Sequence, residues 1–575
     1  MERHAELGSP GGAPIQPLTA LFVLLLTMSV SYAQTHPDAA QTAEVKRLYE
    51  AGRYGDVLLA VPPGPNTPDL ELYRGLSQAQ LHQYAEAEQT LRSASESYPR
   101  DARFPTELGG IAYREKQYPA ATAYLRRALR IDPEDTYVNQ FLGSTYFLVG
   151  NVEAALKFWN RVGQPVLHDF SFDPAPSMPP RLLDQVFPFA PGSVWKLTQY
   201  RTTNAELQAL DLFPGVSYDL RAQQSGDFHL VLHPAAYSSL RQPGTALVST
   251  LRGLPYQAID PEFHNVKSTG WNWPSFVRWD DQKRMLASDW SGPIAGNPHQ
   301  VLRLHFDGRN ENWIISSTLL PGRTIAPAGF NMERIAASVA LESLFGARWR
   351  WTLGPEYSWR RFRSQTNLPG QTAAFFAGTS GFALRSEVNS ELLRIPEHRF
   401  TLEGTARTEM GSFFTNPLGR YGRVEGALAL DWLPQETGED YAMQSKLRTG
   451  GNIGQVPFDD LFLLGFDRDN ALWMRGHNGL RDGRKGNAPL GREFVLSNSE
   501  INKIVYRNGF LKLRAGPFVD TGNIYDPSSF FGSRKWLTDT GVQFRIRALG
   551  SAEFVLGYGR DLRAGRNTFF TTVSR

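Results

Sequence analysis

Small residues recur every 34 positions in the first third of the chain. Glycine and alanine each hold one fixed place in three successive units, at Gly75, Gly109 and Gly143 and at Ala87, Ala121 and Ala155. Prolines at 99 and 133 close two of the units. This period indicates helix–turn–helix units, in which small residues let paired helices approach closely and proline ends the second helix. We expect residues 41–165 to form an α-solenoid; a plain amphipathic bundle is the alternative.

One of these units carries a family resemblance. The stretch LGGIAYREKQYPAATAYLRRALRIDP at 108–133 resembles a tetratricopeptide repeat, and VKRLYEAGRYGDVLLAV at 45–61 resembles a shorter first unit. The resemblance implies a surface that binds another protein or acts as a spacer. It does not identify the partner.

The only long apolar run in the sequence lies near the N-terminus. Residues 19–30 are followed by small residues that place a cleavage site after Ala33. The run is too short for a comfortable membrane span, so it predicts a secretory signal peptide over residues 1–33. The alternative is an uncleaved anchor. Since no other segment has the length and apolarity of a spanning helix, membrane integration would have to use strands.

Residues 166–237 alternate between strand and helix patterns. A strand pattern at 166–174 precedes a short helical stretch, and 193–213 has apolar residues at helical spacing. Two alternating stretches, VSYDLRAQQ and FHLVLHP, are then joined through a Ser-Gly-Asp turn. The pattern predicts a small α+β domain of order β-α-α-β-β. This order resembles that of a polypeptide-transport-associated (POTRA) domain.

Short alternating segments fill residues 240–575. In 541–549, Val542 and Phe544 share one face while Arg545 and Arg547 share the other. Aromatic residues make up 12% of the chain, which suits a lipid-facing surface. At about 20 residues per strand and loop, this region predicts an antiparallel transmembrane β-barrel of about 16 strands. A secreted β-sandwich or propeller is the alternative.

Four blocks near the C-terminus resemble the BamA/TamA-type outer-membrane surface-antigen superfamily. They are 474-MRGH-477 for an R-G loop, 496-LSNSEINKIV-505 for an N-x-E-x-R strand, 516-GPFVDTGNIY-525 for an F-x-D-x-G strand, and 541-GVQFRIRALGSAEFVLGYG-559. The blocks occur in the family's order and follow a POTRA-like unit. They depart from its pattern at both flanks of the R-G pair, and Lys503 stands near the place of the expected arginine.

The resemblance implies an anchor for a loop that folds into the barrel. Arg475 would pack against the Phe518–Gly522 strand, with Asp520 and Glu500 as acceptors and Gly476 allowing close approach. A planar guanidinium can hold two carboxylates by charge-assisted bonds, which offsets the entropy lost in fixing the loop. The alternative is that Arg475 and Asp520 are ordinary solvated charges. The predicted anchor residues are Arg475, Gly476, Glu500, Phe518, Asp520 and Gly522.

Signatures of catalysis and of nucleic-acid binding are weak or missing in the sequence. We find no nucleophile elbow, zinc-protease, Walker or dinucleotide motif, and there is no cysteine. Residues 467–470 lack the glycine and glutamate of a calcium loop and are interpreted as a polar loop. The 60 basic and 57 acidic residues give no excess charge for nucleic acid. We therefore expect no enzyme activity, no cofactor and no metal.

Two classes of function follow from this organisation. The first is a bacterial outer-membrane barrel that inserts or translocates polypeptides, with the repeats and the POTRA-like domain recruiting clients or partners in the periplasm. The second is a glycan (exopolysaccharide) export porin on a repeat scaffold. A purely tethering role is third. The chain ends in Arg575 instead of an aromatic residue, which departs from the family's C-terminal assembly signal.

Overall fold

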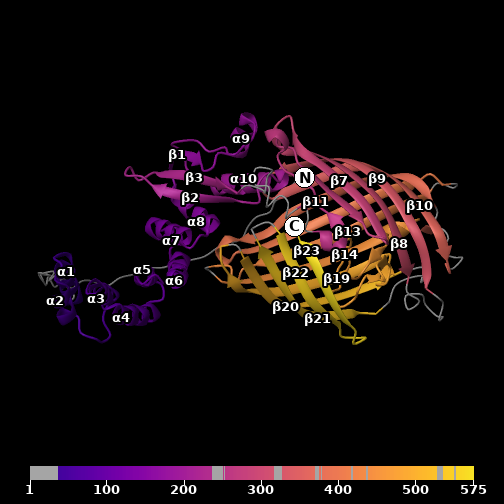
Figure 1. Ribbon diagram of the computed structural model, residues 1–575. Coiled ribbons are helices and arrows are strands. Elements are labelled where there is room, and N and C mark those ends of the chain that lie inside the picture. Colours follow the sequence, from indigo (N-terminus) through magenta and orange to yellow (C-terminus); the bar gives the residue numbers. More distant parts are fainter. Residues whose placement is uncertain are drawn as a thin grey trace, which may run out of the picture. The chain divides into compact units, whose positions relative to one another are not determined.

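A computed structural model gives the fold of the chain (Figure 1). The predicted signal peptide lies outside the described residues. The described residues fall into two compact units that divide between Tyr98 and Pro99. The structure describes residues 37–235 and 250–574, with gaps at 251–252, 316–326, 369–374, 377, 416–418, 436–437, 510, 527–534 and 549–551.

In the described part of the chain, eight α-helices precede the first strand. The first unit contains α1 (Pro37–Glu50), α2 (Tyr54–Ala60), α3 (Pro68–Gln80) and α4 (Tyr84–Ser97). The second unit begins with α5 (Arg103–Arg114), α6 (Tyr118–Ile131), α7 (Thr136–Leu148) and α8 (Val152–Trp159). The helices of α3–α4, α5–α6 and α7–α8 pack as consecutive pairs. Helix pairs thus recur at the period of the small residues.

The repeated glycines are the points where paired helices touch. A Cβ atom at Gly109 would lie 2.8 Å from Leu125 of the next helix, which is too close for real atoms. The large partner side chains repeat at the same period, and the three alanines are fully buried. The six small residues therefore pack as their spacing predicts. The contacts are Gly75 to Leu91, Gly109 to Leu125 and Gly143 to Trp159.

Adjacent glycines on α5 provide a matched test of this packing. We expect Gly109→Leu to destabilise the helix pair by about 1–3 kcal/mol, because the added side chain overpacks the contact with Leu125. A Cβ at Gly110 meets only the end of Glu107 at 4.0 Å. Gly110→Leu should therefore be neutral or stabilising by up to about 1 kcal/mol. Thermal melting of the helical circular-dichroism signal measures both; equal losses would contradict the packing.

A small α+β unit follows the helices in the order predicted from the sequence. Its elements are β1 (Leu167–Phe172), α9 (Pro180–Val186), α10 (Leu197–Leu210), β2 (Val216–Ala222) and β3 (Phe228–Pro234). β3 is central, parallel to β1 and antiparallel to β2. Trp195 is fully buried in the core between this sheet and its helices.

A large antiparallel sheet forms the rest of the molecule and curls into a barrel (Figure 1). Among the described residues it contains fourteen strands of seven residues or more. The strand order returns from β23 to β4. Its strands are β4 (Ala258–Ile259), β5 (Glu262–Phe263), β6 (Trp273–Trp279), β7 (Lys283–Ile294), β8 (Asn297–Ile315), β9 (Ala328–Phe345), β10 (Trp349–Thr366), β11 (Thr379–Ile395), β12 (Phe400–Phe413), β13 (Gly419–Trp432), β14 (Tyr441–Gly454), β19 (Glu493–Arg507), β20 (Leu511–Tyr525), β21 (Leu537–Ala548), β22 (Ala552–Asp561) and β23 (Asn567–Ser574).

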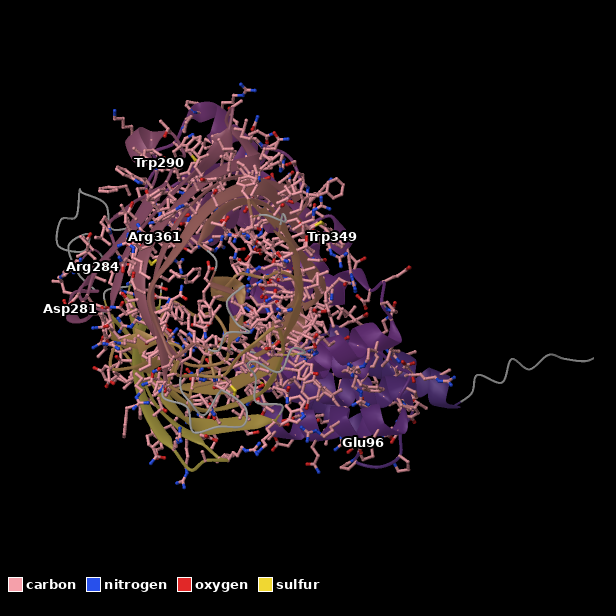
Figure 2. All side chains as sticks on the ribbon, turned by 90° about the vertical axis from the view of Figure 1, so that its right-hand side faces the viewer. Glu96, Asp281, Arg284, Trp290, Trp349 and Arg361 are labelled. Carbon is pink, nitrogen blue, oxygen red and sulfur yellow. The ribbon has the colours of Figure 1, made fainter. Side chains whose placement is uncertain are left out.

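Side chains alternate between the two faces of this sheet as the sequence predicts. Val542 and Phe544 are 47% and 45% exposed on the outer face, whereas Gln543 between them is buried. Figure 2 shows side chains inside the ring, and it shows Trp290 and Trp349 on its outer side. The outer face is therefore apolar and the inner face polar. Within the part of the chain that the structure describes, no helix has the length and apolarity to cross a membrane.

The last helix pair is fixed to one end of the barrel. Glu153 of α8 is nearly buried and accepts bonds from Arg394 of β11, at 2.6–2.9 Å, and from Arg201 of α10, at 2.7 Å. The Asn151 side-chain amide donates to the carbonyl of Pro396 in the turn between β11 and β12, at 2.8 Å. One carboxylate thus joins the helices, the α+β unit and the barrel.

A buried acid lies at a second junction, between α10 and β8. Glu206 is 2% exposed, and its Oε1 lies 3.2 Å from Nδ1 of His299. Burial raises the pKa of Glu206 to about 8. A carboxyl whose pKa is raised on folding keeps its proton while the unfolded chain loses one, so it weakens the fold as pH rises from about 5 to about 8.

Glu206→Gln removes this titration. We expect the variant to be more stable than the parent at pH 8 by on the order of 2 kcal/mol, and to differ little from it at pH 5. The reason is that the amide stays neutral at both values. Thermal melting of the two proteins at each pH measures the difference. Parallel pH profiles would show that Glu206 does not titrate in this range.

Candidate functional site: a segment that crosses the barrel interior

The connection between β14 and β19 folds into the barrel. Residues 455–492 contain four two-residue strands, of which β15 (Phe462–Leu463) pairs with β18 (Leu490–Gly491) and β16 (Leu480–Arg481) pairs with β17 (Arg484–Lys485). Lys485 also pairs with Trp313 of β8 on the barrel wall. Much of the segment is buried. We call residues 455–492 the luminal segment.

Arg475 holds the luminal segment to three wall strands. Its Nε and Nη2 donate to the two carboxylate oxygens of Asp520 at 2.9 and 2.6 Å, and its backbone N–H donates to the same carboxylate at 2.9 Å. Nη1 donates to Glu500 at 2.6 Å and to Gln543 at 3.0 Å. The guanidinium carbon lies 3.8 Å from the ring centre of Phe518. Both Arg475 and Asp520 are buried, so water competes little for these bonds.

The two predicted glycines allow close approach beside this arginine. A Cβ at Gly476 would lie 2.7 Å from Asp539 and from the backbone nitrogen of Asp561. The Gly476 N–H donates to Asp539 at 2.6 Å, and its carbonyl accepts from Thr568 at 2.9 Å. A Cβ at Gly522 would meet Met474 at 3.2 Å. The structure thus brings together Arg475, Gly476, Glu500, Phe518, Asp520 and Gly522.

Sequence reasoning missed several residues of the same cluster. Arg545 of β21 donates to Glu500 at 2.5 Å. The N-x-E-x-R pattern places a second cation on β19, and in this chain an arginine of β21 takes its role. Lys503 instead lies over the ring of Tyr441. Asn498 donates to Asp520 at 2.7 Å. The alternation of residues in the sequence predicts that Arg545 faces the barrel interior. It does not predict that its partner is Glu500 on another strand.

A second anchor fixes the start of the luminal segment. Arg360 of β10 is 1% exposed and donates to both oxygens of Asp459, at 2.7 and 2.8 Å, and to Asp460 at 3.0 Å. Arg334 of β9 lies 3.2 Å from Asp459. The carbonyl of Asp460 accepts from Arg423 of β13 at 2.8 Å. These contacts hold the segment to the side of the barrel formed by β9, β10 and β13.

A third anchor corrects the interpretation of residues 467–470 as a polar loop. Asp467 is 1% exposed and lies 3.1 Å from Nζ of Lys283 on β7. Asp469 accepts from Arg278 of β6 at 2.6 Å. Lys485, from the same segment, donates to Glu311 of β8 at 2.7 Å. The stretch is polar because it forms a buried ion network with the wall, which a local sequence pattern does not distinguish from a solvated loop.

One group near Gly476 has the residue types of a cation site. Ligand atoms of His477, Asp539 and Asp561 lie within 4.8 Å of one another. The two ring nitrogens of His477 face different carboxylates, with Nδ1 at 2.9 Å from Asp539 and Nε2 at 3.4 Å from Asp561. His477 therefore serves as the partner of both carboxylates. The three side chains add a further contact between the luminal segment and strands β21 and β22.

The space left in the barrel beside the segment is polar. A cavity of about 480 Å³ is lined by residues of both charges from β8–β13 and by Asp459 and Asp460. Opposite charges lie side by side there, as for Arg385, which lies 3.1 Å from Glu409. Such a lining suits water and extended polar chains better than an apolar ligand.

Comparisons with known proteins concern the fold. No family model matches the chain, and no curated protein does. Similar solved structures include BamA from Haemophilus ducreyi lacking POTRA domains 1–3, with 10% identity, a TM-score of 0.42 and coverage of 72% of this chain and 85% of that chain. CdiB from Acinetobacter baumannii has 14% identity, a TM-score of 0.42 and coverage of 71% and 73%. CdiB from Escherichia coli has 12% identity, a TM-score of 0.44 and coverage of 72% and 75%.

Proposed function

We propose that the chain is a bacterial outer-membrane barrel of the BamA/TamA type that inserts or translocates polypeptides. The helix pairs act as tetratricopeptide repeats, and residues 166–237 act as a POTRA-like domain. Both lie in the periplasm and recruit clients or partner proteins. The observation that carries this proposal is the luminal segment, which three sets of buried ion pairs hold across the barrel interior.

A filled interior supports protein handling over passive export. A porin for glycans needs a continuous water-filled path, whereas residues 455–492 occupy the interior and contact wall strands on several sides. Breaking one buried ion pair leaves an unpaired charge, which costs about 3–5 kcal/mol. The segment therefore stays in place unless several contacts are exchanged together.

The location in a membrane is supported by the outer face. Apolar side chains exposed there include Trp349 and Leu353 of β10 and Val424 and Leu428 of β13. The inward-facing neighbours Thr352, Arg423 and Glu425 are polar and line the interior cavity, as a lipid-facing barrel wall requires. Because α8 contacts the turn between β11 and β12, that end of the barrel is the periplasmic one in this proposal.

Two strand edges offer places for a client chain. In the α+β sheet, β2 pairs with β3 on one side only, and such an edge can accept an added strand. In the barrel, β23 and β4 meet at a seam where the hydroxyl groups of Tyr256 and Thr571 lie 2.6 Å apart. β4 has two residues, so few backbone bonds can join it to β23. We place client entry at this seam.

The alternative is a glycan export porin with the helix pairs as its scaffold. The 34-residue repeat favours it, since repeats of this kind also occur in such exporters. A steady open conductance is its signature, whereas a plugged barrel conducts little. A tether that holds a periplasmic complex is the third possibility. Such a protein would show neither precursor insertion nor a steady conductance.

Reconstitution in proteoliposomes tests the proposal. The full chain should increase the protease-protected, heat-modifiable fraction of an added unfolded barrel precursor several-fold over empty liposomes, and should conduct little in planar bilayers. Heat-denatured chain is the control. A steady conductance without any precursor insertion would favour the export porin instead.

A further inference from the structure

The outer face of the barrel carries an apolar groove across β11–β14. Its volume is about 820 Å³, and the side chains around it are among the most exposed apolar ones in the chain. Met410 and Ile453 are 68% and 72% exposed, and Phe382 is 55% exposed. A patch of this kind in a soluble protein would mark a binding surface.

Strand register explains the shape of the groove. Met410 pairs with Gly422, and Gly422 pairs with Ile453, so a residue without a side chain lies between two protruding ones. A Cβ at Gly422 would already approach Ile453 to 3.2 Å. Leu384 extends the same row on β11, opposite Met410. The result is a trough with apolar walls and a floor at Gly422.

Two polar side chains, Ser412 and Arg420, mark one end of the trough. Ser412 of β12 pairs with Arg420 of β13, which is two residues from Gly422 along the same strand. The hydroxyl of Ser412 is buried and finds no hydrogen-bond partner within the described part of the chain. Arg420 is exposed and has no ion-pair partner among the described residues. An unpaired cation and an unpaired hydroxyl beside an apolar trough match a ligand with an anionic head and a hydrocarbon chain.

The position of the groove along its strands indicates which leaflet of the membrane it faces. Ser412 is near the end of β12 (Phe400–Phe413), and Arg420 is near the start of β13 (Gly419–Trp432). The opposite end of β12 adjoins the turn that α8 contacts. In the membrane orientation of the proposed function, on which this inference rests, the groove therefore faces the outer leaflet at headgroup depth.

We propose that this groove binds a phosphorylated glycolipid of the outer leaflet. A hydrocarbon chain lies in the trough between Met410 and Ile453, and the phosphate contacts the Arg420 guanidinium. The Ser412 hydroxyl pairs with a polar group at the head of the chain. Arginine suits this role because its planar fork matches phosphate oxygens.

Lipid retention by the full chain tests the site. The protein, purified in detergent, is incubated with lipid A and examined by native mass spectrometry. We expect Arg420→Glu and Gly422→Leu each to lower the retained fraction at least tenfold, the first by repulsion and the second by filling the trough. Gly426→Leu is the matched control on β13, because a Cβ there meets only Thr449 at 3.8 Å.

Each outcome has a distinct meaning. Unchanged retention in both variants overturns the site, and so does equal binding of dephosphorylated lipid A. Retention of phosphatidylglycerol as strong as that of lipid A overturns the choice of glycolipid. Heat-modifiability of every variant confirms that the barrel is folded. Failure of the precursor-insertion assay would reject the transport proposal and leave this site standing, whereas a chain that does not enter bilayers would reject the membrane orientation.

Discussion

Arg475→Ala should strongly impair the barrel. The change leaves the fully buried carboxylate of Asp520 without its cationic partner, and Glu500 keeps only Arg545 of its two arginines. Removing one member of a buried ion pair costs about 3–5 kcal/mol. We expect the heat-modifiable, folded fraction in membranes to fall several-fold, as measured by gel mobility with and without heating.

Two variants show whether the effect comes from the anchor. Arg475→Lys keeps the charge but lacks the planar fork, so we expect an intermediate loss. Arg407→Ala removes an interior ion pair with Glu387 in which the arginine side chain is 56% exposed, and exposed pairs contribute about 0–1 kcal/mol. An Arg475→Ala protein that folds as well as Arg407→Ala would mean that Arg475 is an ordinary solvated charge.

Replacing residues 456–490 by a four-residue linker should open the barrel. The replacement is sterically possible because β14 and β19 are neighbours, with Gly451 paired to Glu493. It removes all three anchors and leaves the interior to water. We expect planar-bilayer recordings to change from little conductance to a steady, at least tenfold larger one.

A milder variant keeps this prediction testable if the shortened chain does not fold. Arg360→Ala combined with Arg475→Ala breaks two anchors while keeping the segment in the chain. We expect frequent openings of intermediate size. If neither variant raises the conductance, the luminal segment does not close the barrel.

Local patterns predicted the parts of the fold that local contacts determine. The 34-residue period predicted that Gly109 lies where paired helices approach closely, since a helix pair is built from residues close in the chain; the structure places it against Leu125. Alternation alone predicted which side chains of β21 face inward and which face outward, because successive side chains of a strand point to opposite faces of the sheet. The R-G and F-x-D-x-G blocks directed attention to Arg475 and Asp520, which the structure joins.

The remaining anchors were beyond the reach of such patterns. Arg360 and Asp459 are 99 residues apart, and Lys283 and Asp467 are 184 apart. Each is an unremarkable charge in its own stretch of sequence. They meet because the sheet curls round and the luminal segment returns into it. A prediction of these pairs requires the register of the whole barrel.

In the proposed function, a polypeptide client reaches the seam between β23 and β4. A photo-crosslinking amino acid at position 256, on that seam, tests it in living cells, with position 428 on the lipid-facing side of β13 as control. The proposal predicts that position 256 captures unfolded outer-membrane proteins while position 428 does not. Capture of glycan-processing enzymes alone, or of no polypeptide at all, would contradict it.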